Sequence, residues 1–262
     1  MSPALLELLD SDRVRLDYLG LTRLEALDQE LDLALQYGPA LLHIFESAGK
    51  RPDIEAVYDW NYINKSIERA GSPHVGLHLQ LKAEDWPEPI EIGHQERIQS
   101  KKIGERLIHN FTVANGKLSC SVLFENVPYY GFEGTVRTAI EPALMWNLVR
   151  VGVDMLLDVA HLRCTAYHLG VDVYSLASSW PLSAVREIHV SGPTIVDGKG
   201  LMDSHAALCD EDHKILEWLL KRTNAEVLTL EYGGTDPNYE MIEADVSAEL
   251  VRQLTTLGRL IS

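Results

Sequence analysis

The stretch VDMLLDVAHL, residues 153–162, is a short apolar run that ends in an acidic residue and a histidine. Runs of this kind are typical of strands buried on both faces of a parallel sheet. Six further runs share the pattern: VRLDYLGLT (14–22), ALLHIFES (40–47), HVGLHLQL (74–81), LSCSVLFENV (118–127), VREIHVSGP (185–193) and EVLTLEYGG (226–234). PIEIGH (89–94) is a weaker eighth candidate.

Segments with helical spacing separate most of these strands. Leucines three and four residues apart mark 24–37, and the other helical segments are 59–70, 94–111, 136–151, 210–223 and 246–261. This alternation predicts an α/β fold, a single (β/α)₈ TIM barrel over residues 1–262, with an irregular or missing helix between its third and fourth strands. An open doubly wound sheet is the competing architecture, but no GxGxxG follows the first strand.

The composition restricts the class of protein. Its three cysteines are far apart and form no CxxC pair, which argues against a disulfide framework or a zinc ribbon. The formal net charge of −16 disfavours nucleic-acid binding. The N-terminus does not resemble a signal peptide, and no apolar run approaches the ~20 residues of a membrane span. We therefore expect a cytoplasmic protein that binds neither nucleic acid nor membrane.

Residue types that ligate metals recur where the predicted strands end. In a TIM barrel the carboxyl ends of all strands meet at one rim, and the catalytic groups lie there. The strand ends and the loop after the seventh strand carry His78, Glu125, Asp158, His161, His189, Asp203, His205 and Glu231. A lone strand histidine is more often a hydrogen-bonded core residue, but agreement across four successive strands favours a metal site.

The local spacing supports this prediction. Asp203 and His205 are two residues apart, so both point the same way on an extended chain. Asp158 and His161 lie where a strand turns into a loop and can hold adjacent ions. Mixed histidine and carboxylate ligation without cysteine favours zinc, iron or manganese.

Further histidines and one asparagine could complete the site. The possible additional metal or substrate residues are His43, His94, Asn126 and His168. His74 begins the third strand and is expected at the opposite end of the barrel. Residues 210–213 predict the start of a helix, where acidic side chains favour the helix dipole. The predicted loop 192–204 is long enough to be a lid.

At LFENVPYYG, LLDVAHLRCTAYHLG, REIHVSGP, LMDSHAAL and LTLEYGG the sequence resembles a known family. It is similar to the multinuclear non-heme iron-dependent oxidative enzymes, which include the methanobactin-biosynthesis oxidase and belong to the xylose-isomerase-like TIM-barrel superfamily. The resemblance covers residues 118–234 and extends weakly to His78. It implies two or three iron ions, dioxygen, a peptide substrate and a separate peptide-binding partner protein. A clustered cation site could also bind the thiolate or carboxylate of a small substrate.

Two positions depart from the family pattern. His161 stands where the family usually has asparagine, and Asp-x-x-His there is similar to the endonuclease IV and xylose-isomerase-like branch. The alternative is therefore a zinc- or manganese-dependent sugar isomerase or epimerase, or a phosphoester hydrolase. The family's fourth-strand histidine has no clean equivalent unless it is His94. A catalytically inactive binding subunit is disfavoured by the intact set of ligand-type residues.

Overall fold

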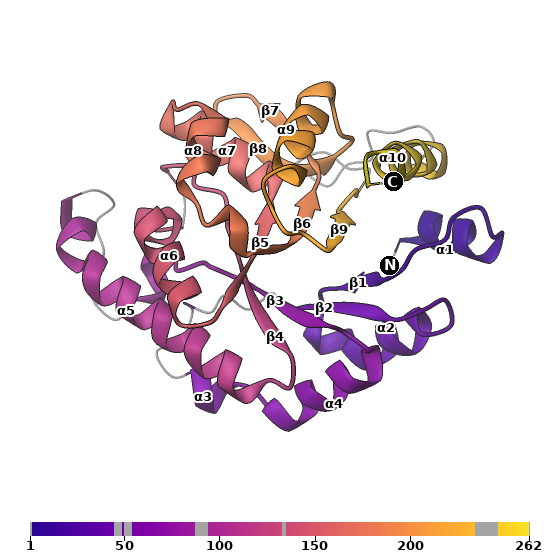
Figure 1. Cartoon of the computed structure of the whole chain (residues 1–262), viewed down its shortest axis with the longest axis horizontal. Helices are drawn as coiled ribbons and strands as arrows, with labels where there is room; N and C mark the ends of the chain where they lie inside the picture. Colours follow the sequence, from indigo (N-terminus) through magenta and orange to yellow (C-terminus); the bar gives the residue numbers. More distant parts are fainter. Residues whose placement is uncertain are drawn as a thin grey trace.

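The structure is a computed structural model that describes residues 2–44, 49, 54–86, 94–132, 135–233 and 246–261. Within these residues seven parallel strands form one sheet in the order β1-β2-β3-β4-β5-β6-β9. The strands are β1 Leu19–Leu21, β2 Ala40–Ile44, β3 His74–His78, β4 Ser121–Glu125, β5 Asp154–Asp158, β6 Val185–Val190 and β9 Val227–Leu230. The sheet curls into a nearly closed barrel (Figure 1), which confirms the predicted TIM-barrel class.

Helices cover the outer face of this sheet. They are α1 Pro3–Asp10, α2 Leu27–Ala34, α3 Ile54–Val57, α4 Trp60–Ala70, α5 His94–Lys117, α6 Pro142–Arg150, α7 Val159–Leu169, α8 Val173–Ser179, α9 Asp210–Leu220 and α10 Val246–Ile261. Short 3-10 turns are η1 Leu24–Ala26, η2 Ala83–Asp85, η3 Arg137–Ile140 and η4 Leu182–Ala184. None of the described helices is both long and apolar enough to cross a lipid bilayer.

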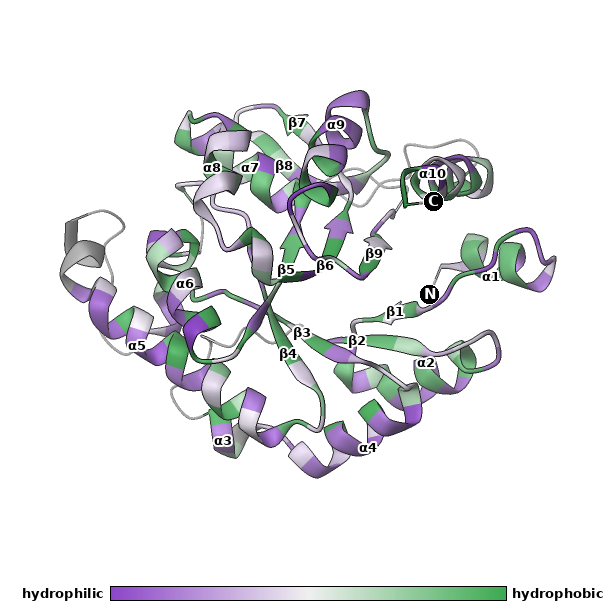
Figure 2. Ribbon diagram, viewed as in Figure 1, coloured by the Kyte–Doolittle hydropathy of each residue, from purple (hydrophilic) through white to green (hydrophobic). Residues whose placement is uncertain are grey.

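The core lies between the sheet and these helices, as the hydropathy colouring indicates (Figure 2). On α5, Leu107 and Phe111 are fully buried one helical turn apart, so the helix turns one apolar face to the sheet. The Phe111 ring meets that of Phe124 on β4 edge-on, with centroids 6.3 Å apart. β4 itself is buried at its last four positions, as expected for a strand covered on both faces.

The strand register sets ligand-type residues at a common level. His78 is the register partner of Glu125 between β3 and β4. Asp158 is likewise the partner of His189 between β5 and β6. Because all these strands are parallel, their carboxyl ends form a single rim, as the sequence predicts.

The connection between β3 and β4 differs from the prediction. β3 pairs directly with β4, so no strand lies between them in the sheet. The strand predicted at 89–94 is wrong at His94, because this residue begins α5. Residues 87–93 lie outside the described residues. Glu125 therefore ends the fourth strand rather than a fifth.

The run 153–162 is also divided differently. Its strand ends at Asp158, and α7 begins at once because the Asp158 carboxylate accepts a hydrogen bond from the His161 backbone N–H at 2.6 Å. Most of α7 is buried, so its sequence lacks the alternation of polar and apolar faces that predicts a helix. The helix ends at Gly170, which adopts the left-handed conformation with φ 64°.

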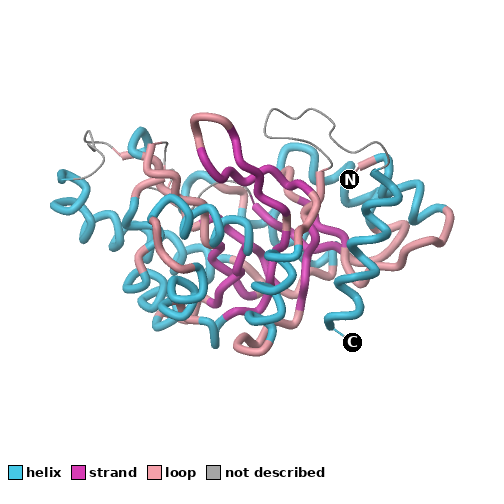
Figure 3. The backbone as a smooth tube through the Cα atoms, turned by 90° about the horizontal axis from the view of Figure 1, so that it is seen from above, coloured by secondary structure: helices cyan, strands magenta, loops and turns pink. Residues whose placement is uncertain are grey.

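The predicted loop and lid at 192–204 is instead a β-hairpin. β7 Gly192–Val196 and β8 Gly200–Ala206 form a separate antiparallel sheet, which stands out from the barrel strands (Figure 3). A Cβ at Gly192 would lie 2.2 Å from the carbonyl oxygen of Ala207, so the start of the hairpin requires glycine. The helix predicted at 210–223 is confirmed as α9.

Candidate metal centre

The carboxyl end of the barrel holds a connected cluster of histidines and carboxylates. The eight residues predicted from the strand ends come together there, and His43 of β2 joins them. The ligand-type contacts link His43, His78, Glu125, Asp158, His161, His189, Asp203, His205 and Glu231. That each of these residues ligates a metal remains a prediction.

Glu125 lies at the middle of the cluster and is 1% exposed. Its Oε2 is 2.6 Å from His43 Nε2 and 3.0 Å from His78 Nε2. Its Oε1 is 3.3 Å from His161 Nδ1. Burial alone would raise the pKa of Glu125, but the charges of His78 and His43 outweigh it and hold the pKa well below its usual value. Glu125 is therefore an ionised carboxylate with both oxygens turned to histidines.

Asp158 is fully buried at the end of β5. Its Oδ1 caps α7, whereas its Oδ2 has no hydrogen-bond partner. Burial raises the pKa of Asp158 to about 7; the charge of His161 lowers it, and the neighbouring carboxylates Asp203 and Glu125 raise it. The charge of His161 therefore does not offset the burial of this carboxylate.

His189 of β6 and Glu231, which follows β9, form the next part of the cluster. His189 Nδ1 is 3.2 Å from Glu231 Oε1 and 3.9 Å from Glu125 Oε1. Neither contact makes a hydrogen bond with Nδ1. Burial opposes ionisation of Glu231, but the positive charge of His189 lowers the Glu231 pKa to about 2. Glu231 is therefore ionised at neutral pH.

The β7–β8 hairpin supplies Asp203 and His205. Asp203 Oδ2 is 3.2 Å from His161 Nε2 and 3.3 Å from His205 Nε2. Burial alone would lower the pKa of His205, but Asp203 and Glu231 raise it to about 9. His205 has a left-handed φ of 49°, a strained conformation for a non-glycine residue and one that concentrates at functional sites. Its side chain is 44% exposed and marks the open side of the cluster.

The residues present fit a metal. Asp158 Oδ2 and His189 Nδ1 are buried polar atoms without hydrogen bonds, and each such atom costs about 1–3 kcal/mol. A cation between them would satisfy both. The donors are imidazole nitrogens and carboxylate oxygens without thiolate, a set that suits zinc, iron or manganese. Ligand atoms lie within 4.8 Å of one another in three groups: His43–His78–Glu125, Glu125–Asp158–His161 and Asp158–His189–Glu231.

The other predicted candidates lie in different surroundings. The Asn126 amide donates to the Asp158 carbonyl at 3.0 Å and accepts from the Asp158 N–H at 2.9 Å, so it aligns the ends of β4 and β5. His168 lies outside the cluster, with Nε2 2.9 Å from the Leu201 carbonyl and its ring edge-on to Tyr130. The side chain of His94 lies outside the described residues.

Sequence reasoning missed two buried residues behind the cluster. His74 begins β3, as predicted, but its Nε2 is 2.6 Å from Glu187 Oε2 in the barrel interior. The other oxygen of Glu187 is 3.1 Å from His189 Nε2. Glu187 and His189 are two residues apart on β6, so strand alternation places them on one face, and this signal could have identified Glu187.

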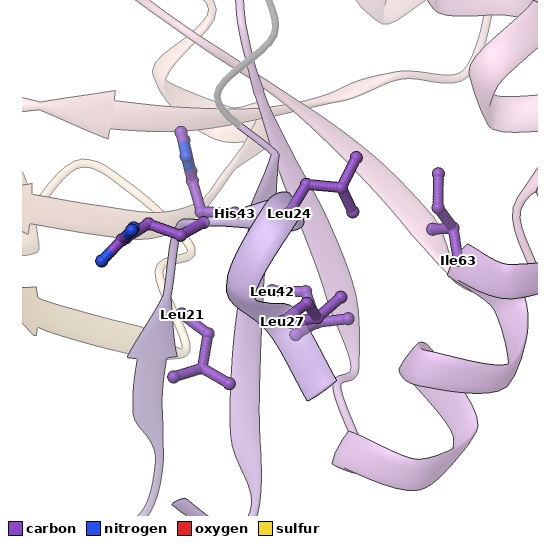
Figure 4. A pocket seen from close by; sticks show the side chains of 7 residues that line it. Leu21, Leu24, Leu27, Leu42, His43 and Ile63 are labelled. Carbon is purple, nitrogen blue, oxygen red and sulfur yellow. The ribbon is translucent and has the colours of Figure 1, made fainter. Parts of the chain in front are cut away.

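A small pocket is lined in part by His43 of β2 (Figure 4). Its lining residues are Leu21, Arg23, Leu24, Leu27, Leu42, His43 and Ile63. Five of the seven are leucine or isoleucine side chains at the junction of β1, β2, α2 and α4. The lining is therefore mostly apolar, unlike the polar cluster.

Comparison with known proteins agrees with this geometry. Residues 99–253, more than half of the chain, match the family described as RiPP precursor modification enzyme MbnB/TglH/ChrH. This chain belongs to that family. The barrel fold and a cluster of side chains that could hold metal ions agree with membership of this family, as the resemblance predicts.

Curated relatives of this MbnB/TglH/ChrH family chain are UPF0276 proteins. That of Bordetella parapertussis is 34% identical over 143 residues, 51% of this chain and 49% of the relative. That of Chromobacterium violaceum is 27% identical over 132 residues, 50% of this chain and 47% of the relative. The chain spans about half the length of the curated relatives it matches.

Solved structures share the fold. D-psicose 3-epimerase from Clostridium cellulolyticum H10 superposes with a TM-score of 0.61 at 11% identity, over 100% of this chain and 95% of that one. L-ribulose 3-epimerase gives a TM-score of 0.60 at 13% identity, over 98% and 88%. At such low identity these similarities support the barrel fold alone and nothing about the reaction.

Proposed function

We propose that this protein is an iron- and dioxygen-dependent oxidase that modifies a peptide, or a small thiol or carboxylate substrate, at a di- or trinuclear centre. The observation that carries the proposal is the sharing of ligands between the three metal groups. Glu125 belongs to two groups, and so does Asp158. Carboxylates have two oxygens and can bridge neighbouring cations, so this arrangement suits several ions better than one.

Bound iron would supply Lewis-acid binding of a thiolate or carboxylate and activation of dioxygen at an open coordination position. The chain's own residues would determine where substrate approaches. His205 is the most exposed member of the cluster, whereas Glu125 and Asp158 are almost completely buried, so substrate would enter from the hairpin side.

Aromatic residues line this same side. The Tyr130 hydroxyl accepts a hydrogen bond from the Asp203 N–H at 3.3 Å, and the Tyr130 ring stacks on Phe132. Burial raises the pKa of Tyr130 well above its usual value, so its hydroxyl stays neutral beside the centre. Phe132 and Tyr167 are about half exposed and offer apolar surface to a peptide side chain. A separate peptide-binding partner protein, which the resemblance implies, is part of the proposal.

Metal analysis of protein purified without added metal is the direct test. The proposal expects two or three irons per chain, distributed over the three candidate groups, with a visible ferric absorption. It also expects oxygen consumption when a cysteine-bearing peptide and the partner protein are supplied. Stoichiometric zinc without iron, in protein that consumes no oxygen, would overturn the oxidase.

One observation favours a second candidate, a zinc- or manganese-dependent isomerase, epimerase or phosphoester hydrolase. His161 replaces the family's usual asparagine, and its ring contacts Asp158 at 3.6 Å and Asp203 at 3.2 Å. The metal would then polarise a carbonyl or activate water without dioxygen. Turnover of a sugar or phosphoester by the zinc- or manganese-loaded protein under anaerobic conditions would support this candidate.

A further inference from the structure

A buried chain of three side chains runs through the barrel interior behind the metal centre. It consists of His74, Glu187 and His189, which are 7%, 3% and 3% exposed. His74 lies on β3 and Glu187 on β6, strands separated in the sheet by β4 and β5, so the two side chains meet across the barrel interior. The distances are 2.6 Å from His74 Nε2 to Glu187 Oε2 and 3.1 Å from Glu187 Oε1 to His189 Nε2.

The orientation of the Glu187 carboxylate is held from two sides. His74 occupies Oε2, and the Thr229 hydroxyl donates to Oε1 at 2.5 Å. With both oxygens fixed in this way, Oε1 is directed at His189. A structural ion pair between His74 and Glu187 would need neither Thr229 nor this direction.

This contact determines which nitrogen of His189 is available. Glu187 accepts a hydrogen bond from Nε2–H of His189 and therefore leaves the Nδ1 lone pair for a cation. Nδ1 faces Glu231 Oε1 at 3.2 Å and makes no hydrogen bond. The same metal group contains Asp158, whose Oδ2 is a second buried atom without a hydrogen bond.

We propose that Glu187, supported by His74, is a positioning residue that presets His189 to bind metal through Nδ1, so that the Asp158–His189–Glu231 group binds the first ion. The inference rests on the metal centre of the proposed function but not on the reaction or on the natural metal. Carboxylates hydrogen-bonded to metal-bound histidines commonly change metal affinity by about 10–100-fold when they are removed.

The test is a titration of the chelator-treated protein with Co²⁺ in competition with a chromophoric chelator. Glu187→Gln retains the shape of the side chain, but its amide can also donate to Nε2 and so permits the other tautomer. We expect the tightest Co²⁺ step to weaken about 10–100-fold and the weaker steps to stay unchanged. His74→Gln should weaken the same step by a smaller factor, because Thr229 still holds Oε1.

Asp212→Asn is the matched control. Asp212 is 1% exposed and pairs with Arg163, away from the centre, so the variant also loses a buried carboxylate charge. We expect a lower unfolding midpoint with all Co²⁺ steps intact. If Glu187→Gln lowers the midpoint in the same way and leaves the tightest step unchanged, Glu187 is only structural and the inference is wrong.

A second measurement covers the case in which Glu187→Gln fails to fold. In the Zn²⁺-loaded protein labelled with ¹⁵N-histidine, NMR should show His189 protonated at Nε2, with the resonance assigned from its loss in His189→Gln. Protonation at Nδ1 would overturn the inference. Failure of the unaltered protein to bind Co²⁺ or Zn²⁺ would overturn the metal centre and the proposed function together, whereas metal binding with the wrong tautomer overturns this inference alone.

Discussion

Helix α7 separates two buried clusters of charge that are satisfied in different ways. On the side of α9, the Arg163 guanidinium pairs with Asp212 and lies 2.6 Å from Glu211 Oε2. On the side of the barrel, His161 meets several carboxylates, yet Asp158 Oδ2 has no hydrogen bond. In the first cluster both oxygens of the buried Asp212 carboxylate have hydrogen-bond partners, whereas in the second one buried carboxylate oxygen has none. Incomplete pairing therefore distinguishes a binding site from a structural ion pair better than burial does.

Removing one carboxylate from each cluster should give the largest and clearest contrast. Asp158→Asn keeps a good cap for α7 and removes a charge that burial disfavours, so the unfolding free energy of the metal-free protein should change little. Metal affinity should fall by about 100-fold or more, because a shared ligand is lost. The measurement is competition between Zn²⁺ binding and a chelator.

Asp212→Asn should do the reverse. It leaves the buried Arg163 with only the exposed Glu211, and breaking a buried pair in this way costs about 3 kcal/mol of unfolding free energy. Chemical denaturation of the metal-free protein would measure this loss, and Zn²⁺ affinity should remain unchanged. Equal losses of metal affinity in both variants would remove the distinction between the two clusters.

Metal binding by the cluster at the barrel rim should depend on pH. At pH 7 the metal-free centre carries protons on His205, whose pKa is about 9, and on His161, whose pKa is raised well above its usual value. Asp158, with a pKa of about 7, is partly protonated. A metal displaces these protons, so affinity should rise as pH increases from about 6 to 9, by about tenfold per unit for each proton released.

Calorimetry of Zn²⁺ binding in buffers with different ionisation enthalpies would count these protons directly. A positive count at pH 7 is expected. A count of zero, with affinity independent of pH, would show that metal binding displaces no protons from the histidines. The histidines would then not ligate the metal.

A single methyl group should disturb the centre through packing. A Cβ at Gly76 on β3 would lie 2.4 Å from His43 Cδ2 and 3.0 Å from Leu156 Cδ1. Gly76→Ala should therefore displace the His43 ring from Glu125 and lower the unfolding free energy by about 1–3 kcal/mol. Thermal denaturation checks the loss of stability. Gly20→Ala on β1 is the control, because nothing lies within 4 Å of the added atom.

The smallest effect concerns the backbone of the hairpin. His205→Ala and His205→Gly both remove the imidazole, but only glycine adopts φ 49° without a steric penalty. The metal-free glycine variant should be more stable than the alanine variant by about 1 kcal/mol, as measured by chemical denaturation. Equal stability of the two variants would mean that the left-handed conformation is not strained.

The sequence predicts the barrel and its rim well, because parallel strands are apolar runs and their last residues stand out by charge. Glu125, Asp158 and His189 could be placed at one end in this way. The start of α7 could not be predicted in this way, because Asp158 serves both as the cap of that helix and as a member of the cluster. The strand that carries Asp203 and His205 could not be predicted either. The only local sign of its hairpin is the short turn around Gly198 and Gly200.

The contacts inside the barrel could not be predicted from the sequence. His74 begins β3, and sequence reasoning places the start of a strand at the end of the barrel opposite to the rim. Glu187 spans that distance from β6, and pairing across the barrel depends on the curvature of the whole sheet rather than on any local pattern. His43 was only a secondary candidate, although it makes the shortest contact of Glu125.

The β7–β8 hairpin has a consequence for how such enzymes can change. Among the described residues, β8 pairs with β7 and with no strand of the barrel sheet, yet it carries two members of the cluster. Residues 192–206 could therefore be exchanged between relatives as one cassette while every hydrogen bond of the barrel ladder is kept. The barrel strands would keep the other members of the cluster, such as Glu125, Asp158 and His189. Asp203 and His205 would form the part of the coordination shell that evolution, or a designer, can replace.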